Sequence, residues 1–178
     1  MAVVQNHFFR VIFFILVICC SPGFTGNMVS VHDSPALKAE RLASFARYIT
    51  WPEDYLGEHF IISIYGDRNF YEYLVFLFKE RQIKNREVVV NFITSPTEMP
   101  GCHILFFSQS DSVHIQQFLG YLQDSPVLTI ADTGCDPCEG LVITLSGSGE
   151  TFSFNLGASA RARLNVSSRL LEVAEKVY

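Results

Sequence analysis

HILFFSQSDSVHIQQFLGYLQDSPVLTIA, residues 103–131, carries the clearest structural pattern in the chain. The apolar run His103–Phe107 and the β-branched run Val127–Ala131 are each typical of a buried strand. Ser110–Leu122 lies between them and predicts a helix that is capped by Ser110 or Asp111. A strand, a helix and a second strand in this order form a parallel pair of strands with the helix packed on one face.

The segments before this stretch continue the alternation. Phe60–Tyr65 and Val88–Ile93 are short β-branched runs that predict strands. The aromatic segment Phe70–Phe78 between them predicts a helix, and Arg81–Arg86 predicts a charged turn. A parallel sheet therefore extends upstream of residue 103.

After residue 131 the strict alternation of predicted strands and helices ends. Leu141–Leu145 and Thr151–Phe154 predict two strands that are joined by Ser146–Gly149 as a hairpin. Ala158–Arg163 and Ser168–Val177 predict helices. The expected fold is a single three-layer α/β domain, with a mostly parallel sheet, helices on both faces and a C-terminal antiparallel hairpin.

A helix is also predicted near the start of this domain. Ser34 is a suitable N-cap, and Pro35 suits the first helical position. The helix should end by Trp51, because Pro52 disfavours a helical conformation in the residue before it. Its apolar residues recur at helical spacing, and its charged residues are expected on the opposite side. These charged residues are Lys38, Glu40, Arg41 and Arg47.

Residues 1–26 predict a secretory signal peptide. Arg10 precedes the apolar run Val11–Cys20, which is too short to span a bilayer, and small residues follow it. A buried N-terminal helix and an uncleaved anchor are the alternatives. Lipidation of Cys20 matches poorly, because Ile18 and Cys19 precede it in place of small residues. The expected organisation is a signal peptide (1–26), an N-terminal tail (27–36) and a domain (37–178) that is exported to an oxidising compartment.

Composition argues against two broad classes of protein, disordered chains and nucleic-acid-binding proteins. The chain has 178 residues, of which 49% are hydrophobic, so it has enough apolar surface to fold. Its net charge of −5 argues against a broad phosphate-binding surface, so no nucleic-acid partner is expected.

The cysteines carry the sharpest local signal. Cys135 and Cys138 form a CxxC between two predicted strands, where no helix N-terminus is expected to stabilise a thiolate. A local disulfide is therefore favoured, either as a structural staple or as a redox sensor. Cys102 is expected to be a buried free thiol, with a bond to another cysteine as the alternative. Zinc bound by these three cysteines and His103 is a weaker option.

No catalytic or cofactor-binding motif is found in the sequence. GxSxG, GxGxxG and Walker loops are absent. Asp67 and Asp132 follow predicted strands and could mark a small-molecule site at the carboxyl edge of the sheet. Capping a turn is the commoner role for such an aspartate.

Several segments resemble the YfiR-like family of exported bacterial proteins, through their order and spacing. The segments are Leu37–Pro52 (LKAERLASFARYITWP), Ile61–Asp67 (IISIYGD), Gly101–Phe106 (GCHILF), Pro126–Asp132 (PVLTIAD), and Phe152–Asn155 (FSFN) running into Leu164–Leu171 (LNVSSRLL). The resemblance covers about Leu37 to Val177.

The resemblance implies a periplasmic α/β domain without enzymatic activity or cofactor. Such a protein binds the periplasmic region of a membrane-bound sensor or diguanylate cyclase, represses it, and lowers cyclic-di-GMP and biofilm formation. Cys135 and Cys138 match the family's late cysteine pair at closer spacing. Cys102 matches an earlier family cysteine whose partner has no counterpart here. Homodimerisation is left open, and periplasmic small-molecule binding is the alternative function.

Overall fold

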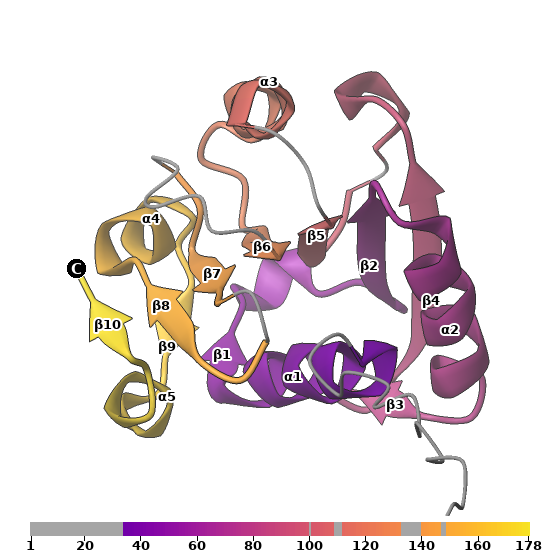
Figure 1. The fold of residues 1–178 in the computed structure, drawn as a ribbon, viewed down its shortest axis with the longest axis horizontal. Helices are drawn as coiled ribbons and strands as arrows, with labels where there is room; N and C mark the ends of the chain where they lie inside the picture. Colours follow the sequence, from indigo (N-terminus) through magenta and orange to yellow (C-terminus); the bar gives the residue numbers. More distant parts are fainter. Residues whose placement is uncertain (1–33, 100, 109–111, 133–139, 147–148) are drawn as a thin grey trace, which may run out of the picture. The chain divides into compact units, whose positions relative to one another are not determined.

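A sheet of eight strands organises the computed structural model, which describes residues 34–99, 101–108, 112–132, 140–146 and 149–178 (Figure 1). The spatial order of its strands is β10 (Lys176–Val177), β8 (Phe152–Phe154), β7 (Ile143–Leu145), β6 (Leu128–Asp132), β5 (Ile104–Ser108), β2 (Phe60–Tyr65), β4 (Arg86–Ile93) and β3 (Gln82–Ile83). Strands β7, β6, β5, β2 and β4 run parallel, and β8 turns back on β7 as an antiparallel hairpin. The predicted α/β architecture is confirmed.

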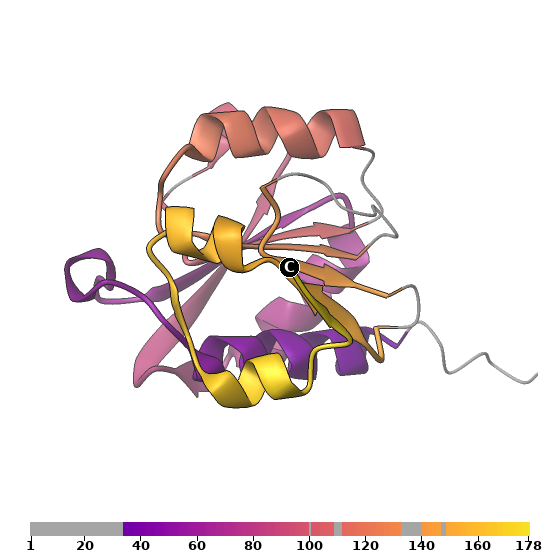
Figure 2. The same cartoon turned by 90° about the vertical axis from the view of Figure 1, so that its left-hand side faces the viewer.

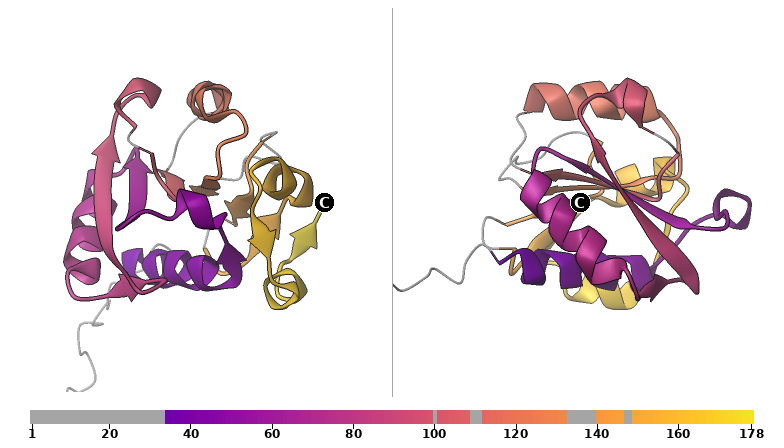
Figure 3. Two further views of the ribbon diagram at one scale, coloured as in Figure 1. Left: turned by 180° about the vertical axis from the view of Figure 1, so that it is seen from behind. Right: turned by 90° about the vertical axis from the view of Figure 1, so that its right-hand side faces the viewer.

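Helices cover both faces of this sheet. They are α1 (Pro35–Tyr48), α2 (Arg68–Phe78), α3 (Ser112–Leu122), α4 (Leu156–Arg161) and α5 (Ser168–Glu172), with short 3₁₀ turns at Glu53–Tyr55 and Pro96–Glu98. Figure 2 shows α3 on one side of the sheet and α1 with α5 on the other. Figure 3 shows that α2 shares the side of α1. A small antiparallel pair, β1 (Ile49–Thr50) with β9 (Asn165–Val166), joins the end of α1 to the segment before α5.

The central strands are mostly apolar because they are buried on both faces. In β5, Ile104 and Phe106 face the core under α1 and α2, whereas Leu105 and Phe107 face the core under α3. All four side chains are fully buried. This burial explains why the run at residues 103–107 does not alternate with polar residues.

Two segments differ from expectation near the sheet edges. The helix predicted for Ser168–Val177 ends at Glu172, and the chain then forms β10. Pairing with β8 overrides helical spacing there, since Glu175 N–H donates to Phe152 O at 2.9 Å and Tyr178 N–H to Phe154 O at 3.1 Å.

The predicted charged turn at 81–86 contains the short strand β3. Its reversal is made by Lys84 and Asn85, whose φ angles are 53° and 60°.

The first helix is placed as predicted, with one correction. It begins at Pro35, and Ser34 occupies the N-cap position without a side-chain capping bond. Lys38, expected on the solvent side, is only 6% exposed. Within the described part of the chain, no helix combines the length and apolarity needed to cross a membrane.

Candidate functional site

The two aspartates predicted at the carboxyl edge of the sheet have structural partners. Asp67 is the N-cap of α2, where its Oδ1 accepts a hydrogen bond from Phe70 N–H at 3.0 Å. Asp132 Oδ2 lies 2.5 Å from Lys38 Nζ, and both side chains are less than a tenth exposed. Burying Lys38 near the positive end of the α1 dipole is costly, and the carboxylate offsets this cost. The ion pair therefore ties α1 to the end of β6, and neither aspartate suggests an open ligand site.

The predicted disulfide cannot be placed, because Cys135 and Cys138 lie outside the described residues. It remains a prediction. Cys102 is described, and it is a buried thiol that is 1% exposed. Burial raises the pKa of this thiol to about 12, against an opposing effect of the Ser63 hydroxyl. A neutral thiol in this setting is a poor nucleophile and a poor metal ligand.

His103 is the centre of a buried aromatic cluster. Its ring stacks on Phe60 with centroids 4.8 Å apart, and its Nδ1 accepts a hydrogen bond from Ile61 N–H at 2.9 Å. The other ring nitrogen, Nε2, lies 3.3 Å from the Tyr55 carbonyl oxygen and is therefore the protonated one. Burial lowers the pKa of His103, so the ring is neutral near pH 7. Both nitrogens are occupied, and no group of metal-binding side chains is found among the described residues.

Trp51 and Tyr55 close this cluster from the segment after α1. The Trp51 indole N–H donates to the His103 carbonyl at 3.2 Å, and the Tyr55 hydroxyl donates to the Cys102 carbonyl at 3.0 Å. These bonds fix the chain before β5 against the chain after α1. The role of Trp51, the residue before Pro52, is therefore structural.

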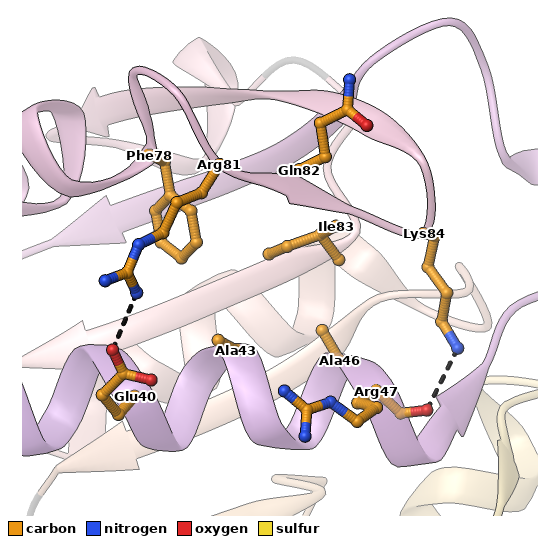
Figure 4. A pocket seen from close by; sticks show the side chains of 9 residues that line it. All are labelled: Glu40, Ala43, Ala46, Arg47, Phe78, Arg81, Gln82, Ile83 and Lys84. Carbon is orange, nitrogen blue, oxygen red and sulfur yellow. Dashed lines mark hydrogen bonds and ion pairs between the residues drawn. The ribbon is translucent and has the colours of Figure 1, made fainter.

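An open groove with a defined lining lies between α1 and β3 (Figure 4). We call it the α1–β3 groove, and its volume is about 500 Å³. Its lining residues are Glu40, Ala43, Ala46, Arg47, Phe78, Arg81, Gln82, Ile83 and Lys84. Small and apolar side chains form the floor, and charged side chains form the rim.

Cations outnumber acids on this rim. Arg81 Nη1 bonds Glu40 Oε1 at 2.8 Å, so the single rim acid is paired (Figure 4). Lys84 Nζ donates to the Arg47 carbonyl at 3.2 Å, and partial burial lowers the pKa of Lys84. The Arg47 side chain is exposed and forms no ion pair with any residue that the structure describes. The rim therefore has a net positive charge on a chain whose net charge is −5.

A second, shallower pocket adjoins the groove at Arg47. Its lining residues are Arg47, Tyr48, Thr50, Asn165, Val166, Ser167 and Arg169, and its volume is about 410 Å³. No acid is among these lining residues. We call it the β1–β9 pocket, after the small strand pair beside it.

These two surfaces were not predictable from the sequence. Arg47, Lys84 and Arg169 lie on α1, on the β3–β4 turn and on α5, far apart in the chain. A prediction would have required the placement of β3 and β9, which are two-residue strands without a pattern of their own. The one available signal was the run of charges on the outer side of the first helix.

Comparison with known proteins agrees with the resemblance seen in the sequence. A family model described as YfiR/HmsC-like matches residues 35–175. No curated protein matches the chain. The matched range spans α1 to the residue before β10 and includes both pockets around Arg47.

Proposed function

The chain belongs to the YfiR/HmsC-like family, and we propose from this membership that it is an exported regulatory protein without enzymatic activity. It binds the periplasmic region of a membrane signalling protein. The target is a diguanylate cyclase, which the chain represses, so that cyclic-di-GMP falls. The observation that carries this proposal is the family match across residues 35–175.

Two features of the structure are compatible with a binding role. The buried clusters around His103 and Lys38 have structural partners, so their polar groups are used in holding the fold. The α1–β3 groove offers an accessible concave surface with an apolar floor and a charged rim. A regulator of this kind acts through such a surface and needs no reacting group.

Repression requires a difference in affinity between two states of the partner. A ligand shifts a two-state equilibrium only as far as it binds one state more tightly than the other. To move a cyclase from almost fully active to almost fully inactive, this preference must be about 10⁴-fold. The chain should therefore contact a part of the periplasmic region that changes between the active and inactive states.

The periplasmic location rests on the predicted signal peptide. Residues 1–26 direct export, and the folded domain includes α1 from Pro35 onward. A location outside the cytoplasm also permits the proposed Cys135–Cys138 disulfide. We propose this bond as a modulator of partner binding, because its two cysteines follow Asp132 at the end of β6.

The direct test is the cyclic-di-GMP content of cells with and without the gene. Deletion should raise cyclic-di-GMP and surface attachment, and restoring the gene should reverse both changes. Unchanged cyclic-di-GMP after deletion, in cells shown to produce the protein, would reject repression of a diguanylate cyclase.

A further inference from the structure

We propose that the α1–β3 groove and the adjoining β1–β9 pocket together recognise an acidic segment of the partner protein. This inference rests on the proposed function, since it names the surface that meets the partner and the chemistry of the segment bound there. The two pockets share Arg47, so they form one surface around the end of α1.

The charge on this surface selects an acidic occupant. Arg47, Lys84 and Arg169 line it, and its only lining acid, Glu40, is paired with Arg81. Neither guanidinium of Arg47 and Arg169 forms an ion pair with a residue in the described ranges. A guanidinium presents donors in a planar fork that matches a carboxylate. Carboxylates of the partner protein could therefore pair with Arg47 and Arg169 without breaking an ion pair within the described part of this chain.

The floor of the groove selects a segment that also carries apolar side chains. Ala43, Ala46, Phe78 and Ile83 form the floor between α1 and β3 (Figure 4). Ala43 is small and partly exposed, so it leaves room above α1 for an incoming side chain. An amphipathic helix or an extended strand with acidic residues on one side fits this combination.

A protein segment explains the shape better than a membrane surface does. The cations lie around a concave space of about 500 Å³ with a recessed apolar floor. An anionic bilayer presents a broad surface that reaches exposed cations but not a floor recessed between a helix and a strand. Vesicle binding is therefore included below as a contrary outcome.

The test uses the purified chain from residue 27 onward and two synthetic amphipathic peptides. The peptides have the same length and the same leucine pattern, and carry either glutamate or lysine at every polar position. Binding is measured by fluorescence anisotropy at low and high salt. The glutamate peptide should bind more tightly than the lysine peptide, and salt should weaken its binding.

Charge reversal locates the site. The double variant Arg47→Glu/Arg169→Glu should weaken binding of the glutamate peptide by about tenfold or more. The matched control is Arg161→Glu/Lys176→Glu, which makes the same charge change at exposed residues that line neither pocket. The control should bind like wild type, and thermal unfolding of both variants checks that they are folded.

Three kinds of result would overturn the inference. The first is a lack of charge discrimination, seen either as equal binding of the two peptides or as equal weakening by the two double variants. The second is binding of the wild-type chain to phosphatidylglycerol vesicles that Arg47→Glu/Arg169→Glu abolishes, which would make the surface a lipid site. The third is a wild-type dimer in sedimentation that the same variant dissociates, which would make the occupant a second copy.

Failure here is distinguishable from failure of the proposed function. Both double variants are also returned to the deletion strain. If wild type lowers cyclic-di-GMP and Arg47→Glu/Arg169→Glu lowers it equally, repression stands and this surface is wrong. If wild type leaves cyclic-di-GMP unchanged, repression is wrong, and the peptide measurement alone decides whether the surface takes an acidic segment.

Discussion

His103 shows how one buried residue can make stability depend on pH. Its ring is held neutral between Phe60, Ile61 and Tyr55, and burial lowers its pKa from the ordinary value of 6.5. The unfolded chain therefore binds a proton at a higher pH than the folded chain does. The neutral His103 ring therefore contributes to the free energy of unfolding in full above about pH 6.5. This contribution is lost as the pH falls from 6.5 through the lower pKa of the folded state.

We predict that the free energy of unfolding decreases as the pH is lowered from about 7 to 5, and that His103 accounts for part of this decrease. The variant His103→Asn, which retains an acceptor near Ile61 N–H, should have a shallower pH dependence although it is less stable at pH 7. Urea unfolding at several pH values measures the pH dependence of the free energy of unfolding for each protein. His59→Gln is the control for replacing a histidine, because the His59 side chain is 41% exposed. Equal slopes for His103→Asn and wild type would contradict the account.

Lys38 and Asp132 provide a second test at the residue scale. Lys38→Met removes one member of the buried pair and leaves a buried carboxylate, so it should cost about 3–5 kcal/mol. The double variant Lys38→Met/Asp132→Leu should recover much of this loss, because no buried charge remains. Chemical denaturation of wild type, Lys38→Met and the double variant measures this loss and its recovery.

The exposed pair Arg81–Glu40 is the matched control for that experiment. Both of its side chains are more than half exposed. Glu40→Gln should therefore cost less than about 1 kcal/mol. If Lys38→Met were as mild as Glu40→Gln, the buried pair would not be holding α1 to β6.

At the scale of elements, strongly patterned segments are predictable and short paired segments are not. Phe60–Tyr65 forms a strand with the predicted bounds, since its β-branched and aromatic residues suit a buried strand. In contrast, β10 lay inside a predicted helix, because its two residues gain strand geometry only from β8. The burial of Lys38 was missed for a related reason. Helical periodicity cannot reveal that a carboxylate at the end of β6 lies opposite one charged residue of α1.

The connection between β6 and β7 carries the proposed disulfide. We predict that Cys135 and Cys138 resist alkylation in the exported protein until a reductant is added, and that Cys102 resists it until the protein unfolds. The second expectation follows from the burial of Cys102 and its pKa of about 12. Mass spectrometry of protein alkylated before and after reduction, in native and denaturing buffer, measures all three residues.

Stability should change little with this bond, because so short a ring removes little entropy from the unfolded chain. A Cys135→Ser/Cys138→Ser variant should therefore unfold close to wild type and differ mainly in repression. Alkylation of Cys135 or Cys138 in protein that has not been reduced would show that the bond is absent. Equal repression by the variant and wild type would remove its role as a modulator.

At the scale of the whole molecule, the distribution of charge matters more than its sum. The net charge of −5 gave no indication of a cationic surface. The fold collects Arg47, Lys84 and Arg169 from three elements, while Glu40 is neutralised by Arg81. Composition could exclude broad classes of partner, but this surface became visible only after the elements were placed.

The family assignment was reached from sequence, because it depends on the order of several segments and not on side-chain contacts. Those same segments turn out to be structural. The segment ending in Trp51–Pro52 bonds the chain at His103, and the segment ending at Asp132 holds Lys38. Motifs that preserve a fold can therefore identify a family while leaving the binding surface undefined.

The measurement that tests the central claim most directly is cyclic-di-GMP in a deletion strain that carries one of two forms of the chain. One form contains residues 1–178, and the other lacks residues 2–26. Immunoblots establish that the two forms accumulate equally. The account predicts that the form with residues 1–178 lowers cyclic-di-GMP to the level of the parent strain, whereas the form confined to the cytoplasm does not. Equal cyclic-di-GMP in the deletion strain and in both complemented strains would contradict it.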